Sequence, residues 1–128
     1  MQQAEILIIS NSAGKRYIFF SALTRLGYRC YTAQNIQEAQ SQMKFANKIK
    51  IVLLFFADGS LDHYVGFDDL SRNFFKKSTQ LFLIGKQPQQ QFQQIAIDPG
   101  TKNYNVCFLP NTTSIHNLIK NIQQTNLK

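Results

Sequence analysis

The sequence has few glycines, prolines and cysteines, and no long apolar run. Its six glycines and three prolines are too few for a chain made largely of linkers. The longest apolar run, Ile51 to Ala57, is far too short to cross a bilayer. The first residues lack the basic start and apolar stretch of a secretory signal, so we expect a cytoplasmic protein. In that compartment the two cysteines are expected to be reduced and to act as small apolar side chains.

The usual motifs for metal or phosphate chemistry are also missing. The two histidines, His63 and His116, lie near no cysteine, and their spacing suits no metal. The segment from Ser10 to Lys15 contains a single glycine, which excludes a glycine-rich phosphate loop. We therefore expect no metal, no cofactor and no enzymatic activity.

Apolar and basic residues are plentiful. With 44% hydrophobic residues, 11 Phe and 5 Tyr, the 128-residue chain can bury the core of one domain, expected to span residues 1–128. The formal net charge of +7 is compatible with nucleic acid or an acidic membrane surface as a partner. However, the cations are scattered, and no basic stripe alternates with aromatic residues. That pattern favours ordinary surface charge over a nucleic-acid site in this domain alone.

Five short apolar segments predict five strands. They cover residues 5–9, 28–32, 49–56, 80–84 and 105–109. The first, third and fourth are continuous apolar runs, which is typical of strands buried on both faces of a parallel sheet.

Helical patterns occupy the intervals between these strands. Ser12 is predicted to cap the first helix, which ends at Gly27, and Asn35 with Glu38 resembles a capping box at the start of the second. The last helix is expected to start near Thr113 or Ser114. The predicted inner faces are, in chain order, Ile18, Ala22, Leu23 and Leu26; Ala39, Met43 and Ala46; Phe67, Leu70 and Phe74; and Ile115, Leu118, Ile119 and Ile122.

Two details of the helical pattern need separate mention. Asp68 and Asp69 in the first turn of the third helix, with Lys76-Lys77 at its end, would complement the helix dipole. The glutamine-rich stretch 87–94 fits either a solvated fourth helix or a loop.

This alternation predicts an α/β fold, a doubly wound (βα)5 flavodoxin-like three-layer sandwich with parallel strand order 2-1-3-4-5. Cys30 and Cys107 would then lie on opposite edge strands roughly 19 Å apart, too far for a disulfide. Ligands of such sheets bind beyond the carboxyl ends of the strands.

Over nearly its whole length the chain resembles the receiver domain of bacterial response regulators. Short segments in a matching order carry the resemblance: Ile6 to Ile9, Ala22 to Tyr28, Ile36 to Ala39, Ile51 to Leu54, Gly66-Phe67 and Leu109-Pro110. The resemblance implies a phosphorylation site made of an acidic pair, an acceptor aspartate, a hydroxyl and a lysine, with Mg²⁺ held by the acids.

The matching positions of this chain carry different residues. The acidic pair falls on Ser10 and Asn11, the hydroxyl on Ile84 and the lysine on Leu109. The family's aromatic switch residue on the fifth strand falls on Val106. The acceptor falls on Phe55 when counted from the strand start, or on Asp58 when counted back from Gly66. The first alignment is favoured, and Asp58 is the fallback acceptor.

The resemblance therefore implies a pseudo-receiver, a regulatory domain that binds a protein partner without being phosphorylated. The family often binds partners, including a second copy, through the face of the fourth helix, fifth strand and last helix. The matching interface candidates are Phe92, Tyr104, His116, Lys120 and Gln123. The polar end of the chain is compatible with the N-terminal domain of a longer regulator.

Three alternatives stay open. The chain could be a nucleic-acid-associated regulator that uses its positive charge, with steep salt dependence of binding. It could be a receiver still phosphorylated at Asp58. It could also be a flavodoxin-like domain that binds a small molecule or carries out catalysis, which would need a pocket.

Overall fold

The fold is built on one parallel sheet. A computed structural model describes residues 4–46, 48–56, 66–85, 104–110 and 112–126. Its strand order is β2-β1-β3-β4-β5, and every neighbouring pair is parallel. The strands are β1 (Glu5–Ile9), β2 (Cys30–Ala33), β3 (Ile49–Phe56), β4 (Gln80–Gly85) and β5 (Asn105–Pro110). The predicted α/β class and strand order are confirmed.

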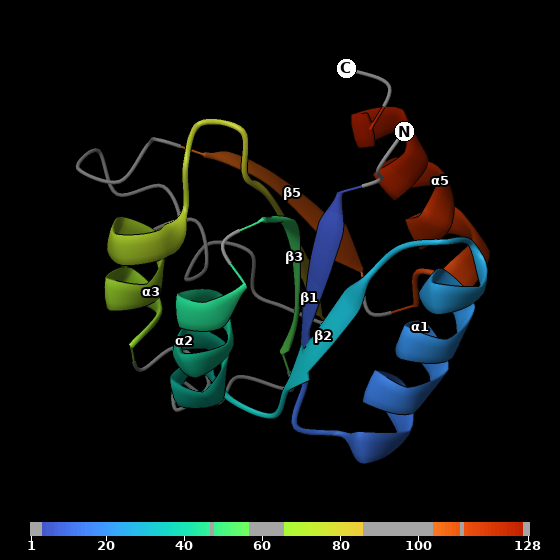
Figure 1. The fold of residues 1–128 in the computed structure, drawn as a ribbon. Coiled ribbons are helices and arrows are strands. Elements are labelled where there is room, and N and C mark those ends of the chain that lie inside the picture. The colour runs from blue at the N-terminus through green and yellow to red at the C-terminus, as the bar shows by residue number, and fades with distance from the viewer. Residues whose placement is uncertain (1–3, 47, 57–65, 86–103, 111, 127–128) are drawn as a thin grey trace.

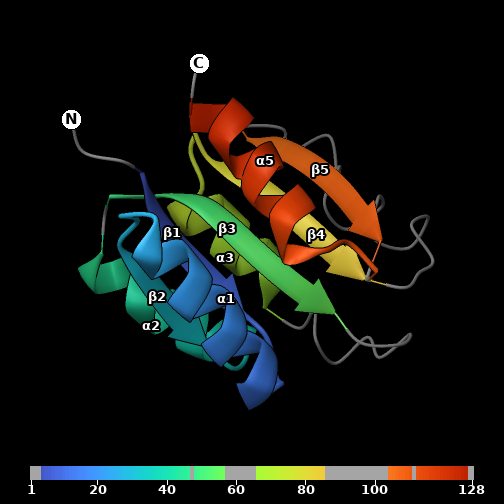
Figure 2. The same ribbon diagram turned by 90° about the vertical axis from the view of Figure 1, so that its right-hand side faces the viewer.

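Helices cover both faces of this sheet (Figure 1). On one face lie α1 (Ala13–Arg25) and α5 (Ile115–Asn126), and on the other lie α2 (Ile36–Phe45) and α3 (Phe67–Phe74). Figure 2 shows α1 and α5 in front of the sheet, with β2 and β5 at its two edges. The core is accordingly split into two apolar clusters, one between the sheet and each helix layer.

The predicted helix starts are capped by side chains. Ser12 Oγ accepts a hydrogen bond from Lys15 N at 3.2 Å, and Asn35 Oδ1 accepts one from Glu38 N at 2.8 Å. Ser114 Oγ does the same for Asn117 N at 3.1 Å at the start of α5. These bonds satisfy backbone donors that have no partner inside the helix. At the end of α1, Gly27 adopts φ +96°, a conformation that side chains with a Cβ disfavour.

The inner face predicted for α1 is only partly right. Leu23 is buried as expected, but Ile18 is 55% exposed and Leu26 41% exposed, and the second buried side chain is Phe19. The pattern was ambiguous because four apolar residues, at positions 17 to 20, follow one another in this helix. Packing against β3 selects the face of Phe19 and Leu23.

Two smaller details also differ from the sequence prediction. β2 begins at Cys30, because Tyr28 N donates to Leu23 O and so belongs to the end of α1. Lys76 and Lys77 lie beyond α3, which ends at Phe74. The predicted stretch 87–94 lies outside the described residues. None of the helices in the described ranges is long and apolar enough to cross a membrane.

Candidate functional site

The carboxyl edge of the sheet brings several predicted site positions into one row. In the β3–β4 ladder Phe55 pairs with Ile84, and in the β4–β5 ladder Ile84 pairs with Leu109. Ile9 pairs with Leu54, which places Ser10 beside Phe55 at the end of β1. The two ladders therefore align Phe55, Ile84 and Leu109 across three adjacent strands. We call these three residues the apolar row.

The apolar row faces the layer of α1 and α5. Phe55 is 5% exposed and Ile84 3% exposed, and Leu109 is half-buried against the same apolar cluster. Neighbouring side chains of this cluster from α1 and α5 include Phe19 and Leu118. The alignment favoured above matches these three positions to the acceptor, the hydroxyl and the lysine of a receiver, and here they are part of the core.

Helix α1 covers the Phe55 ring from outside. The ring centroids of Phe19 and Phe55 are 4.8 Å apart with a tilted geometry, which is favourable for aromatic pairs. Lys15 Nζ lies 5.3 Å from the Phe55 centroid, a distance at which an ammonium is attracted to the face of the ring. Lys15 and Phe19 are four residues apart and so lie on one face of α1.

The contacts of Lys15 and Phe19 with Phe55 were not predicted from the sequence. Their i, i+4 spacing, one turn into a helix that starts directly after β1, is the signal that could have identified them.

The segment after β1 is held by hydrogen bonds among its own residues. Ser10 is buried, its Oγ accepts from Ser12 N at 3.1 Å, and its carbonyl oxygen accepts from Arg16 Nη1. Asn11 is exposed. The two positions matched to the acidic pair thus carry a hydroxyl used for local structure and an exposed amide, with an Arg side chain bonded beside them.

Acidic and metal-binding groups do not gather in the described part of the site. No group of three or more His, Cys, Asp or Glu side chains that could hold a metal occurs among the described residues. Asp58, the fallback acceptor, and Phe92, an interface candidate, lie outside the described residues. Val106, matched to the family's switch aromatic, is half-buried in the cluster on the α2 and α3 face.

The remaining interface candidates divide into two groups. His116, Lys120 and Gln123 are all exposed on α5. Tyr104 precedes β5 and is half-buried, with its ring 4.9 Å from Phe75 in an edge-on contact on the opposite face of the sheet. Tyr104 therefore contributes to the core as well as to the surface.

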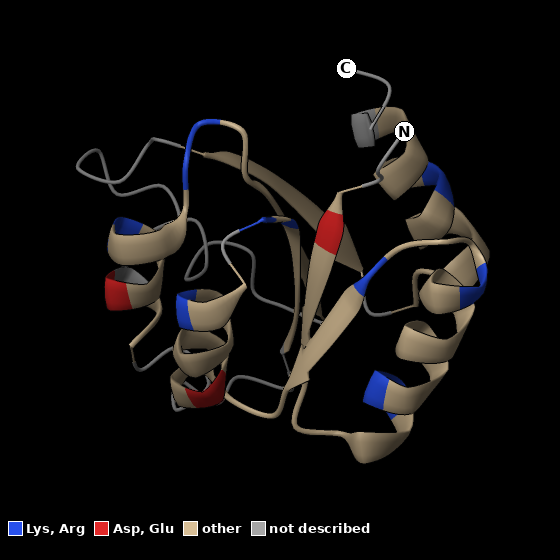
Figure 3. Ribbon diagram, in the orientation of Figure 1, with Lys and Arg blue, Asp and Glu red and all other residues tan. Residues whose placement is uncertain are grey.

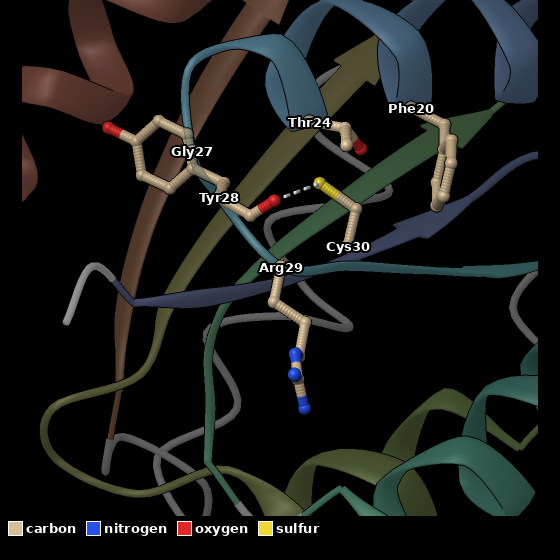
Figure 4. A pocket seen from close by; sticks show the side chains of 6 residues that line it. All are labelled: Phe20, Thr24, Gly27, Tyr28, Arg29 and Cys30. Atoms are coloured by element: carbon tan, nitrogen blue, oxygen red, sulfur yellow. Dashed lines mark hydrogen bonds between the residues drawn. The ribbon is translucent and has the colours of Figure 1, made fainter.

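A hollow of about 380 Å³ lies at the other end of the sheet, between the end of α1 and β2 (Figure 4). It is lined by Phe20, Thr24, Gly27, Tyr28, Arg29 and Cys30. The lining includes no Asp, Glu or His side chain. The hollow is separate from the apolar row.

The two cysteines lie on the opposite edge strands and are both free thiols. Burial raises the pKa of the Cys30 thiol, partly offset by a hydrogen bond with Thr24, and burial also raises the pKa of Cys107. A raised pKa reduces the thiolate fraction, which is the reactive form.

We expect both thiols to react with iodoacetamide at about pH 8 several-fold more slowly than free cysteine does. Mass spectrometry of time points measures the two rates separately. The same chain in concentrated urea is the control and should react at the free rate. A native thiol that reacts as fast as the unfolded control would contradict the described burial.

No protein-family model matches this sequence, and no curated protein matches it. Solved structures do match. Vibrio cholerae chemotaxis protein CheY4 aligns with a TM-score of 0.74 at 15% identity, over 96% of this chain and 98% of that one. The receiver domain of NtrX from Brucella abortus aligns with a TM-score of 0.70 at 17% identity, over 97% and 99%.

A longer protein matches over the same fold. A probable two-component system response regulator/GGDEF domain protein aligns with a TM-score of 0.75 at 17% identity. The match covers 97% of this chain but only 49% of that protein, so the chain spans about half of its length. At these identities the likeness shows the fold, the CheY-like α/β fold of receiver domains.

Proposed function

We propose that this chain is a receiver-like signalling domain that works by binding a protein partner and is not phosphorylated. The observation that carries the proposal is the apolar row. Phosphoryl transfer in a receiver needs oxygen ligands for Mg²⁺ and a cation for the developing charge. The aligned positions Phe55, Ile84 and Leu109 supply only hydrocarbon.

The surroundings of the row support the same conclusion. Lys15 could serve as a cation near the site, but its ammonium lies over the Phe55 ring. Arg16 is used by the carbonyl of Ser10. A single carboxylate at Asp58, beside the hydroxyl of Ser10 and the amide of Asn11, would bind Mg²⁺ weakly.

Exposed side chains on two helices support a binding role. His116, Lys120 and Gln123 present a polar surface on α5, and a protein partner or a second copy of the chain could dock there. The outer side of α1 exposes Tyr17, Ile18 and Phe20, and large apolar side chains gathered on one surface often mark an interaction site. Because the apolar row is packed, we expect the domain to hold one conformation. Binding would then be controlled by the amount of partner present and not by phosphorylation of the domain.

The test is an amide NMR titration with Mg²⁺ and beryllofluoride, which mimics a phosphoryl group. We expect no saturable shifts at Ser10, Asn11 or Phe55, because the row offers no acceptor. The matched control is Asp58→Asn, whose spectrum should respond to the reagents in the same way as the unchanged chain.

A different outcome would favour the alternative. Saturable shifts in the unchanged chain that disappear in Asp58→Asn would make Asp58 a working acceptor in an unusual site. That result would overturn the proposal, and the chain would be a phosphorylated receiver.

A further inference from the structure

The fold gathers cations that are scattered in the sequence at the amino end of the sheet. In Figure 3 they lie toward the end at which β1, β2 and β3 begin. Eight exposed side chains belong to this set: Arg25, Arg29, Lys44, Lys48, Lys50, Arg72, Lys76 and Lys77. We call them the basic end. They come from the ends of α1, α2 and α3, the starts of β2 and β3, and the segment before β4.

Acidic residues are distributed in the opposite way. Glu38 and Asp69 lie in the first turns of α2 and α3, toward the carboxyl end of the sheet (Figure 3). Among the described residues, Glu5 at the start of β1 is the one acid at the basic end. Among the described residues, positive charge is thus concentrated at the amino end of the sheet.

Helix dipoles explain only a part of this arrangement. Helices of this fold end at the amino end of the sheet, and cations in a last turn offset the negative end of the dipole. That accounts for Arg25, Lys44 and Arg72, which lie at the ends of α1, α2 and α3. The other five cations lie in strands and connecting segments, outside any helix.

Two exposed apolar side chains project from the same end. Phe45, the last residue of α2, is 89% exposed. Leu26, the C-cap of α1, is 41% exposed. Because α1 and α2 lie on opposite faces of the sheet (Figure 1), Leu26 and Phe45 belong to different helix layers.

The layout of the charges distinguishes between two kinds of polyanion. Arg29 and Lys77 stand three strand spacings apart, roughly 14 Å along the sheet edge. Arg25 and Lys44 extend the set into both helix layers. The cations therefore form a two-dimensional array, whereas a nucleic-acid backbone is a line of charge that is matched by a stripe or groove.

We propose that the basic end docks on the surface of an anionic lipid bilayer, with Phe45 and Leu26 inserted at the level of the headgroups. Cations near such a surface are attracted to acidic lipids, and amphipathic surfaces add affinity by burying apolar side chains at the boundary. The inference does not rest on the proposed function, because the basic end and the apolar row lie at opposite ends of the sheet.

The first test is sedimentation with vesicles that contain about 30 mol % phosphatidylserine, compared with pure phosphatidylcholine. Removal of one cation should weaken binding about fivefold, so Lys76→Gln/Lys77→Gln should weaken it on the order of 25-fold. The backbone groups of Lys76 and Lys77 make the local hydrogen bonds, so this pair can change without loss of structure. The control Lys15→Gln/Arg16→Gln removes the same charge at the other end and should bind nearly as the unchanged chain does. Because Lys15 lies over the Phe55 ring and Arg16 bonds to the Ser10 carbonyl, the circular dichroism spectrum of this control is first compared with that of the unchanged chain.

The second test places a reporter in the interface. The chain has no tryptophan, so Phe45→Trp carries a single indole. Its emission should shift to shorter wavelength with the anionic vesicles. The matched control is Tyr17→Trp on the outer side of α1, which is 73% exposed in the unchanged chain and should show no shift.

Several results would overturn this inference. They are no binding to anionic vesicles, equal loss in the two double variants, or a shift of the Tyr17→Trp reporter alone. A further contradicting result is that the chain binds a DNA oligonucleotide through Lys76 and Lys77 but does not bind vesicles. That outcome would make the basic end a nucleic-acid site.

Discussion

Replacement of Phe55 by alanine should lower the free energy of unfolding by about 3–5 kcal/mol. The ring is almost completely buried, contacts Phe19 and lies across from Ile84 on the neighbouring strand. Its removal leaves a cavity between the sheet and α1, and Lys15 loses the ring under its ammonium. Urea unfolding followed by far-ultraviolet circular dichroism measures the change.

Phe45→Ala is the matched control for this measurement. The same atoms are removed, but from a side chain that is 89% exposed, so the expected change is within about 0.5 kcal/mol. Equal effects of the two substitutions would mean that Phe55 is not packed. The apolar row would then no longer support the proposal that this domain lacks phosphorylation chemistry.

Strand positions and helix starts could be predicted because each depends on a local signal. Continuous apolar runs at Ile6–Ile9 and Ile51–Leu54 are required of strands covered by helices on both faces. Ser12 and Asn35 cap their helices through side-chain bonds that span only three residues. Right-handed crossovers between parallel strands then leave few possible strand orders.

The buried face of α1 could not be predicted in the same way. Apolar residues at 17, 18, 19 and 20 follow one another, so the helical period alone does not choose a face. The choice depends on the Phe55 ring, which comes from a strand 36 residues further along the chain than Phe19. A contact of this kind is tertiary information.

The strand positions of the candidate site residues could be predicted, but their contacts could not. Alignment to a known family pattern placed Phe55, Ile84 and Leu109, and the strand register puts these positions side by side. Which of Phe55 and Asp58 corresponds to the acceptor stays a prediction, because Asp58 lies outside the described residues.

The basic end shows how topology changes the interpretation of charge. Lys48/Lys50 and Lys76-Lys77 are separate short clusters in the sequence. Because β3 and β4 are adjacent and parallel, the segments that lead into them meet at one edge of the sheet. A census of charge along the sequence therefore underestimates the density of charge on the surface.

Replacement of Ile84 by aspartate should lower the free energy of unfolding by about 5 kcal/mol near neutral pH. Ile84 lies in β4 between β3 and β5, with Phe55 and Leu109 on its two sides. A carboxylate at this position loses its hydration without gaining a partner in the apolar row. A receiver with a wet acidic site would tolerate the same change far better.

The pH dependence of stability in this variant separates the effect of the buried charge from the effect of the changed side-chain shape. Burial raises the folded-state pKa of the new carboxyl above its unfolded value of about 3.9, so the folded chain binds the proton more tightly. Stability is therefore retained at pH values below the unfolded-state pKa of this carboxyl, and it is lost as the pH rises through the folded-state pKa. Urea midpoints measured from about pH 7 down to about pH 4 should increase for Ile84→Asp relative to Ile84→Asn, which cannot ionise. If the two variants have parallel pH profiles and each lowers the free energy of unfolding by less than about 1 kcal/mol, position 84 is hydrated and the apolar row can hold a charge.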